Sequence, residues 1–176
     1  ASPIELTAGD AAGALVIAEG DGAAKLLGRA THAVDFVDHY RGQDEAFDYF
    51  WEERWIRDEG YNKIVPVAVN AALANAGIKA EDVNHFIFPV AAGRVASDLA
   101  KKLGIPDAAV RDNLQGTVGE AGSAHSIVML VQALEEAKRG DIILVTSFGQ
   151  GCDALIFGVT DAVNDAKPAA GISGSI

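Results

Sequence analysis

The spacing of apolar and polar positions along the chain predicts alternating strands and helices. Continuous apolar runs at 85–88 and 141–148 are typical of strands that are buried on both faces of a sheet. Looser alternation over 25–37 and a further run at 154–160 predict two more strands. The predicted helices, each soon followed by a glycine, cover 62–75, 93–103 and 124–138.

A segment rich in aromatic and charged residues lies between Asp38 and Gly60. Counted from Phe47, the residues Phe50, Trp51 and Trp55 follow at spacings of 3, 4 and 8, which predicts one stripe of a helix. Two interpretations remain open. The segment is either a lid helix that packs its stripe on the core, or an aromatic cage for a ligand.

The order of the predicted elements indicates the fold class. It runs strand, two helices, strand, helix, short strand, helix, strand, tight turn and strand. This order is typical of an α/β fold, a three-layer α/β/α unit with a five-stranded mixed sheet. Residues 163–176, rich in Ala, Gly and Ser, are expected to form a flexible tail or linker.

Composition narrows the possible functions. Of the 176 residues 49% are hydrophobic, enough for one compact core. Fourteen basic against 25 acidic side chains give a net charge of −11, which disfavours nucleic acid as a partner. The single cysteine, Cys152, excludes an internal disulfide and suggests a cytoplasmic protein. The chain shows no apolar run of about 20 residues, and no spacing typical of a metal site or a nucleotide loop.

Three motifs in order carry a resemblance to a known family. They are Ala-Lys-Lys-Leu-Gly-Ile at 100–105, Gly-Glu-Ala-Gly-Ser at 119–123 and Asp-Ile-Ile-Leu-Val-Thr-Ser-Phe-Gly-Gln-Gly at 141–151. Together they resemble the C-terminal half of thiolase-superfamily proteins of the hydroxymethylglutaryl-CoA synthase and ketoacyl-ACP synthase III type. The resemblance covers residues 8–162 and implies the thiolase-like half fold.

The start of the chain resembles the end of the first half of such proteins. Gly-Asp-Ala-Ala-Gly-Ala-Leu-Val leads into a strand-like run at 12–18. The resemblance therefore divides the chain into residues 1–19, the end of a missing N-terminal half, and a C-terminal thiolase-like domain over 20–162. The alternative is a complete small domain with its own start.

The resemblance also implies a chemistry, from which this sequence departs twice. In the family a first-half cysteine carries the acyl group, and a histidine and an asparagine of the second half hold the thioester oxygen and handle protons. The stretch His85-Phe-Ile-Phe-Pro-Val-Ala-Ala-Gly places Val90 where the histidine is expected. The asparagine corresponds to Glu120.

Two side chains are candidates for the catalytic role. Glu120 is a candidate general base, although Thr117 and Glu120 also have the spacing of a capping box, in which the glutamate serves the backbone. His125, in the first turn of a predicted helix, is a candidate proton donor or acceptor near pH 7, or else a packing residue.

Five further residues are candidates for lining the substrate. Cys152 lacks an adjacent base and is expected to be an inert buried thiol rather than a nucleophile. Glycines allow the backbone to approach a substrate closely. The candidate substrate-binding residues are Val90, Gly119, Gly149, Gly151 and Cys152.

The resemblance leaves two functions open. One is an acyl-CoA-dependent acyltransferase or condensing enzyme with a divergent site, which uses an acyl-CoA or acyl carrier protein thioester and needs no cofactor. The other is a catalytically silent subunit that scaffolds an active partner. Family members pair as homo- or hetero-dimers, and a zinc-ribbon/OB-fold companion is a further possible partner. A binding module unrelated to acyl transfer is the third alternative.

Overall fold

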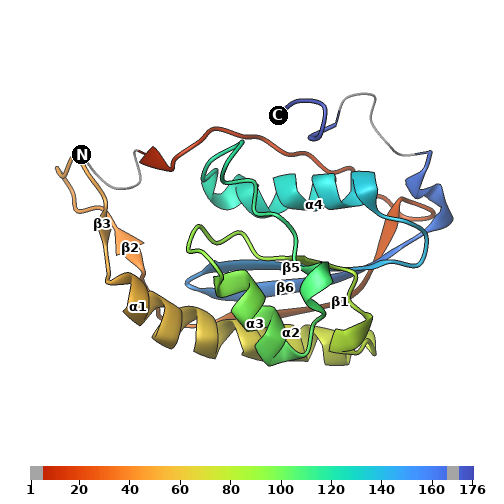
Figure 1. The fold of residues 1–176 in the computed structure, drawn as a ribbon, viewed down its shortest axis with the longest axis horizontal. Coiled ribbons are helices and arrows are strands. Elements are labelled where there is room, and N and C mark those ends of the chain that lie inside the picture. The colour runs from red at the N-terminus through yellow and green to blue at the C-terminus, as the bar shows by residue number, and fades with distance from the viewer. Residues whose placement is uncertain (1–5, 166–170) are drawn as a thin grey trace.

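The computed structural model describes residues 6–165 and 171–176. It has three layers, with a central sheet, α4 (His125–Glu136) on one face, and α2 (Asn62–Ala76) and α3 (Val95–Leu103) on the other (Figure 1). A small hairpin lies apart from this sheet, near the start of α1 (Glu53–Trp55) (Figure 1). The layered α/β class that the sequence predicts is therefore confirmed.

The central sheet is four-stranded and mixed. Its strands are β1 (Ala24–Ala33), β4 (His85–Ile87), β5 (Ile142–Gly149) and β6 (Gly151–Val159), in the order β1-β6-β5-β4. β4 and β5 run parallel, while β6 is antiparallel to both β5 and β1. The apolar runs predicted for β4 and β5 follow from this topology, because the sheet is covered on both faces.

One continuous helical run leads from the hairpin to the core. It consists of α1 (Glu53–Trp55), a π-helical turn (Ile56–Tyr61) and α2. Asn62 therefore lies inside the run and does not cap its start. Gly77, with φ at +67°, ends α2, and its N–H donates to two carbonyls of the last turn.

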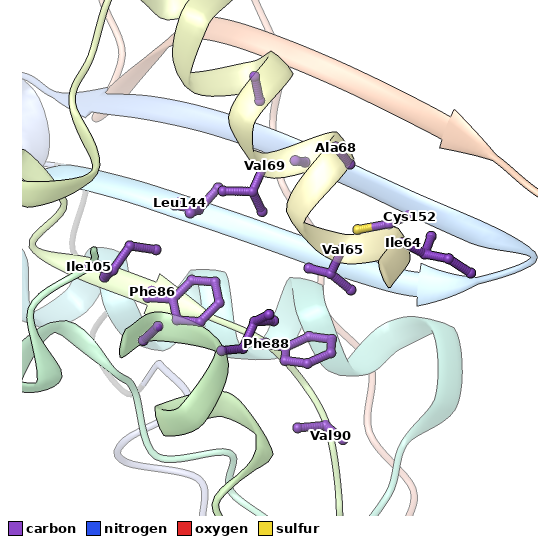
Figure 2. Close-up of a cluster of buried hydrophobic side chains, with 14 of the residues drawn as sticks. Ile64, Val65, Ala68, Val69, Phe86, Phe88, Val90, Ile105, Leu144 and Cys152 are labelled. Carbon is purple, nitrogen blue, oxygen red and sulfur yellow. The ribbon is translucent and has the colours of Figure 1, made fainter. Parts of the chain in front are cut away.

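Two buried clusters fill the spaces between the layers. Below the sheet, the side chains of α2 and α3 pack on β4, β5 and β6, and Figure 2 shows Val65, Val69, Phe86 and Leu144 in this cluster. Above it, α4 packs Met129 and Leu130 on Ile143 and Val145. Because alternate residues of β5 join different clusters, this strand packs against the helices on both faces of the sheet.

The prediction of a five-stranded sheet was wrong. The expected short strand between α3 and α4 is reduced to one bridge, Phe86 to Val110, with Arg111 N–H donating to the Phe86 carbonyl. The side chain of Asp112 then accepts a hydrogen bond from Leu114 N–H, and the side chain of Asn113 accepts one from Gln115 N–H. These side-chain turns draw the backbone away from the ladder.

The aromatic segment is a hairpin and not a helix. β2 (His39–Tyr40) and β3 (Tyr49–Phe50) pair as a two-stranded sheet, and the helix begins only at Glu53. Cross-strand ring contacts explain the difference, since the Tyr40 and Tyr49 rings lie 5.4 Å apart and the His39 and Phe50 rings are stacked.

Segments near both ends of the described chain run along the side of the sheet that α4 covers (Figure 1). The strand-like run at 12–18 has no ladder partner, and Val16 and Ile17 are almost fully exposed. Near the other end, the Glu135 carboxylate of α4 accepts hydrogen bonds from Ile172 N–H and Ser173 N–H. Residues 166–170 of the expected flexible tail lie outside the described residues, and that expectation stays a prediction.

Candidate functional site

Val90 follows β4 in the chain and lies in the core. Its side chain is 5% exposed and belongs to the cluster below the sheet, where Figure 2 shows it just beyond Phe88. Its N–H donates to the Phe88 carbonyl. Its own carbonyl accepts a hydrogen bond of 2.8 Å from the Asn113 side chain. At this position the chain therefore presents an apolar side chain and no hydrogen-bond donor.

His125 is held by two backbone groups and is only 1% exposed. Its Nε2 lies 2.6 Å from the Asn113 carbonyl oxygen, and its Nδ1 accepts a hydrogen bond from Ala121 N–H at 3.2 Å. This pattern fits the neutral tautomer with the proton on Nε2. Both ring nitrogens are thus occupied, and His125 fixes the loop around Asn113.

Glu120 lies at the mouth of the turn that opens α4. Its Oε1 accepts a hydrogen bond from Gly122 N–H at 3.1 Å, and its Oε2 accepts one from the Gln115 amide at 2.9 Å. Its side chain is 26% exposed. Thr117 instead donates through its hydroxyl to the Leu114 carbonyl, so the capping box does not form. Glu120 therefore stabilises the turn that follows it, and part of its side chain remains exposed to solvent.

The backbone around Gly119 is joined to the start of the described chain. Glu120 N–H donates to the Thr7 carbonyl at 2.6 Å, and Gly9 N–H donates to the Glu120 carbonyl at 2.9 Å. Gly119 and Glu120 are therefore tied to the N-terminal segment, which fixes the direction in which the Glu120 side chain leaves the backbone.

Gly149, Gln150 and Gly151 form the tight turn between β5 and β6. Gly151 has φ at +117°, and a Cβ placed on it would lie 2.1 Å from the His32 carbonyl oxygen. Only glycine fits there, because β1 packs directly against the turn. The turn lines a shallow hollow of about 240 Å³ that Ser123 of the α4 turn also lines. The two glycine-rich loops thus meet at one end of the sheet.

Cys152 lies inside this end of the sheet. It is 3% exposed and pairs in register with Phe148 and His32. Figure 2 shows it among the buried side chains next to α2. Burial, and then the neighbouring charge of Asp153, raise the pKa of the Cys152 thiol to about 12. A thiol with this pKa holds no thiolate at neutral pH and is unsuited to nucleophilic attack.

The sequence and the fold are similar to those of proteins of known family. Residues 73–157 match the family model of the 3-oxoacyl-[acyl-carrier-protein] synthase III C-terminal domain. The hydroxymethylglutaryl-CoA synthase of Aeropyrum pernix is 32% identical over 171 residues, 95% of this chain and 47% of that protein. That of Pyrobaculum neutrophilum is 28% identical over 170 residues, 95% of this chain and 48% of that protein. These matches support a thiolase-superfamily C-terminal half.

Solved structures show the same half fold. The 3-oxoacyl-[acyl-carrier-protein] synthase III of Aquifex aeolicus matches 80% of this chain and 46% of that one, with a TM-score of 0.67 and 24% identity. Xanthomonas campestris OleA matches 78% of this chain and 39% of that one, with a TM-score of 0.59 and 20% identity. The chain therefore spans about half the length of the relatives that it matches.

The structure of this half brings some of the predicted residues together. Glu120 and His125 share one hydrogen-bonded loop, with 3.7 Å between Glu120 Oε1 and His125 Nδ1. Asn113 joins that loop to Val90. The turn from Gly149 to Gly151 meets the loop through Ser123. The functional roles of these residues stay predictions.

Sequence reasoning missed three residues of this site. Asn113 and Gln115 bind His125 and Glu120, and their only sequence signal is their place in a glycine-punctuated loop. Tyr61 ends the π-helical turn and lies against both Phe88 and Phe148, with ring centroids 5.5 and 4.8 Å away. No local pattern marks Tyr61, because its two neighbours are distant in sequence.

The described residues contain neither a metal-binding group of side chains nor a helix that could span a membrane. Within 6–165 and 171–176, no group of three or more His, Cys, Asp or Glu side chains has a metal-binding arrangement. No described helix is both long and apolar enough to span a membrane.

Proposed function

We propose that this half belongs to an acyltransferase that makes or breaks a carbon–carbon bond beside a thioester, with a divergent second-half site. The substrate would be a thioester of coenzyme A or of acyl carrier protein. The meeting of the two glycine-rich loops beside Glu120, at one end of the sheet, carries this proposal. The match to condensing enzymes over 95% of the chain supports it.

Glu120 is the group that can move a proton. Both of its oxygens accept hydrogen bonds, as expected of an ionised carboxylate, and part of the side chain reaches solvent. In the proposed reaction Glu120 takes the α-proton of the thioester, and the electron pair of that C–H bond moves toward the carbonyl oxygen. His125 is a positioning residue that holds the loop. A cysteine outside this chain would carry the acyl group.

A silent subunit is the second candidate. Two observations favour it: Val90 presents no donor, and the ring nitrogens of His125 are both occupied. Loss of one oxyanion donor costs about 3–4 kcal/mol of transition-state stabilisation in comparable sites. In this role the fold would pair with an active thiolase-like subunit, or hold a zinc-ribbon/OB-fold companion.

Intact-mass measurement of the full-length protein after exposure to short acyl-CoAs separates the two candidates. A condensing enzyme gains the mass of one acyl group on a cysteine outside this chain. A silent subunit gains none with any thioester. An adduct on Cys152 would contradict the assignment of this thiol as inert.

The variant Glu120→Gln tests the proton transfer. Gln keeps the size of the side chain and an oxygen that can accept from Gly122 N–H, so the turn should persist. We expect the condensation rate to fall by about 100–10,000-fold with acyl-adduct formation unchanged. Glu81→Gln, at an exposed position, is the matched control. Full activity of Glu120→Gln would restrict Glu120 to a structural role.

A further inference from the structure

Tyr61 stands between the two segments that frame the candidate site. Its ring makes edge contacts with Phe88, two residues before Val90, and with Phe148, the residue before Gly149. Gly60 allows this approach, since a Cβ on it would lie about 3 Å from the rings of Phe36 and Phe148. The π-helical turn therefore seats Tyr61 against both segments.

The Tyr61 hydroxyl is a donor without a partner. Among the described residues it makes no hydrogen bond, and it is not one of the fully buried polar atoms left unpaired. A half-buried phenol usually pairs its hydroxyl with a protein group. Here the hydroxyl remains free to bind a ligand atom.

The surroundings keep this hydroxyl protonated. Burial comes first, and the negative charges of Asp38, Glu120 and Glu53 add to it, so that the pKa of Tyr61 rises to about 12. The phenol is therefore neutral across the physiological pH range and can donate a hydrogen bond.

We propose that Tyr61 donates its hydroxyl hydrogen to the thioester carbonyl oxygen, the role for which Val90 offers no group. This inference rests on the proposed function. When Glu120 takes the α-proton, negative charge collects on the thioester oxygen, and a fixed neutral donor stabilises that charge. The Tyr61 proton stays on the phenol, and the α-proton moves from carbon to Glu120.

Deuterium exchange tests this role directly. The full-length protein is incubated with acetyl-CoA in D₂O, and deuterium entering the acetyl methyl group is followed by mass spectrometry, together with the acyl adduct on the protein. The variant Tyr61→Phe removes the hydroxyl and keeps the ring contacts with Phe88 and Phe148. Tyr40→Phe, at an exposed position of the hairpin, is the matched control.

We expect Tyr61→Phe to slow deuterium exchange by about 100–1,000-fold, with the adduct yield and the melting temperature unchanged. Tyr40→Phe should exchange at the wild-type rate. Wild-type exchange in Tyr61→Phe would overturn the role of Tyr61 and leave the proposed function intact. A fall in melting temperature that accounts for the slower exchange would make Tyr61 structural. Absence of both adduct and exchange in the wild type would overturn the proposed function, and this inference with it.

Discussion

The two ionisable side chains singled out near α4 differ in what their surroundings allow. His125 is buried and bound at both ring nitrogens, while Glu120 is bound at both oxygens and still partly exposed. Sequence places both beside the start of one helix and cannot rank them. The carbonyl of Asn113 makes the difference, because it binds the Nε2 atom of the buried His125 ring.

Cys152→Ala tests the inertness of the buried thiol. Because burial raises the pKa of Cys152 to about 12, we expect acyl transfer by the full-length protein to be unchanged. The lost packing should lower the free energy of unfolding by about 1 kcal/mol. Activity assays and urea unfolding measure the two effects. A loss of activity larger than the loss of folded protein would contradict this interpretation.

Among the elements, the aromatic segment shows how tertiary contacts override local spacing. The spacing of Phe47, Phe50, Trp51 and Trp55 fits a helix, yet residues 49–50 pair with 39–40 as a hairpin. Trp55 does lie in a helix, where it stacks on Phe36 with 4.7 Å between ring centroids. Residues 49–50 form a strand because they pair with residues 39–40, which lie outside the segment whose spacing fits a helix.

The tight turn between β5 and β6 gives a matched pair of variants. Gly151→Ala would place a Cβ on the His32 carbonyl at a positive φ, so we expect a loss of about 2 kcal/mol or more in the free energy of unfolding. Gly149→Ala meets no atom within 4 Å and should cost under about 1 kcal/mol. Thermal and urea unfolding measure both. Equal losses would show that the approach of β1 does not constrain the turn.

For the whole molecule, the dependence of stability on pH is set in part by Asp141. Burial alone would raise the pKa of Asp141, but hydrogen bonds from His85 and from Lys138 N–H outweigh burial and lower this pKa below its usual 3.8. The hydrogen-bonded pair of His85 and Asp141 lies at the start of β5, at the opposite end of that strand from Gly149. It therefore contributes to stability and does not belong to the candidate site.

Asp141→Asn tests this contribution. A carboxylate whose pKa is lower in the folded state stabilises the fold above pH 3.8, and this stabilisation disappears as the pH falls through the lowered value. We expect the wild type to lose more of its free energy of unfolding than Asp141→Asn between pH 6 and pH 3. Urea unfolding across this range measures the difference, with the exposed Asp21→Asn as control. Parallel curves for all three proteins would exclude the effect.

The sequence determined the elements whose signals are local. The apolar runs of β4 and β5 and the ends of α2 and α3 at Gly77 and Gly104 follow from burial on both sheet faces and from glycine's left-handed conformation. The motifs around 119–123 and 141–151 also located the two loops of the candidate site, and the absence of a donor at Val90 is visible in the sequence itself.

Only the tertiary structure decided how these parts meet. The carbonyl of Asn113 is hydrogen-bonded to His125 Nε2, and the His32 carbonyl of β1 leaves room only for glycine at position 151. Tyr61 lies between Phe88 and Phe148. Each of these contacts joins residues that are separated along the chain. Their formation depends on packing across the sheet and between loops, which no periodicity within one segment can encode.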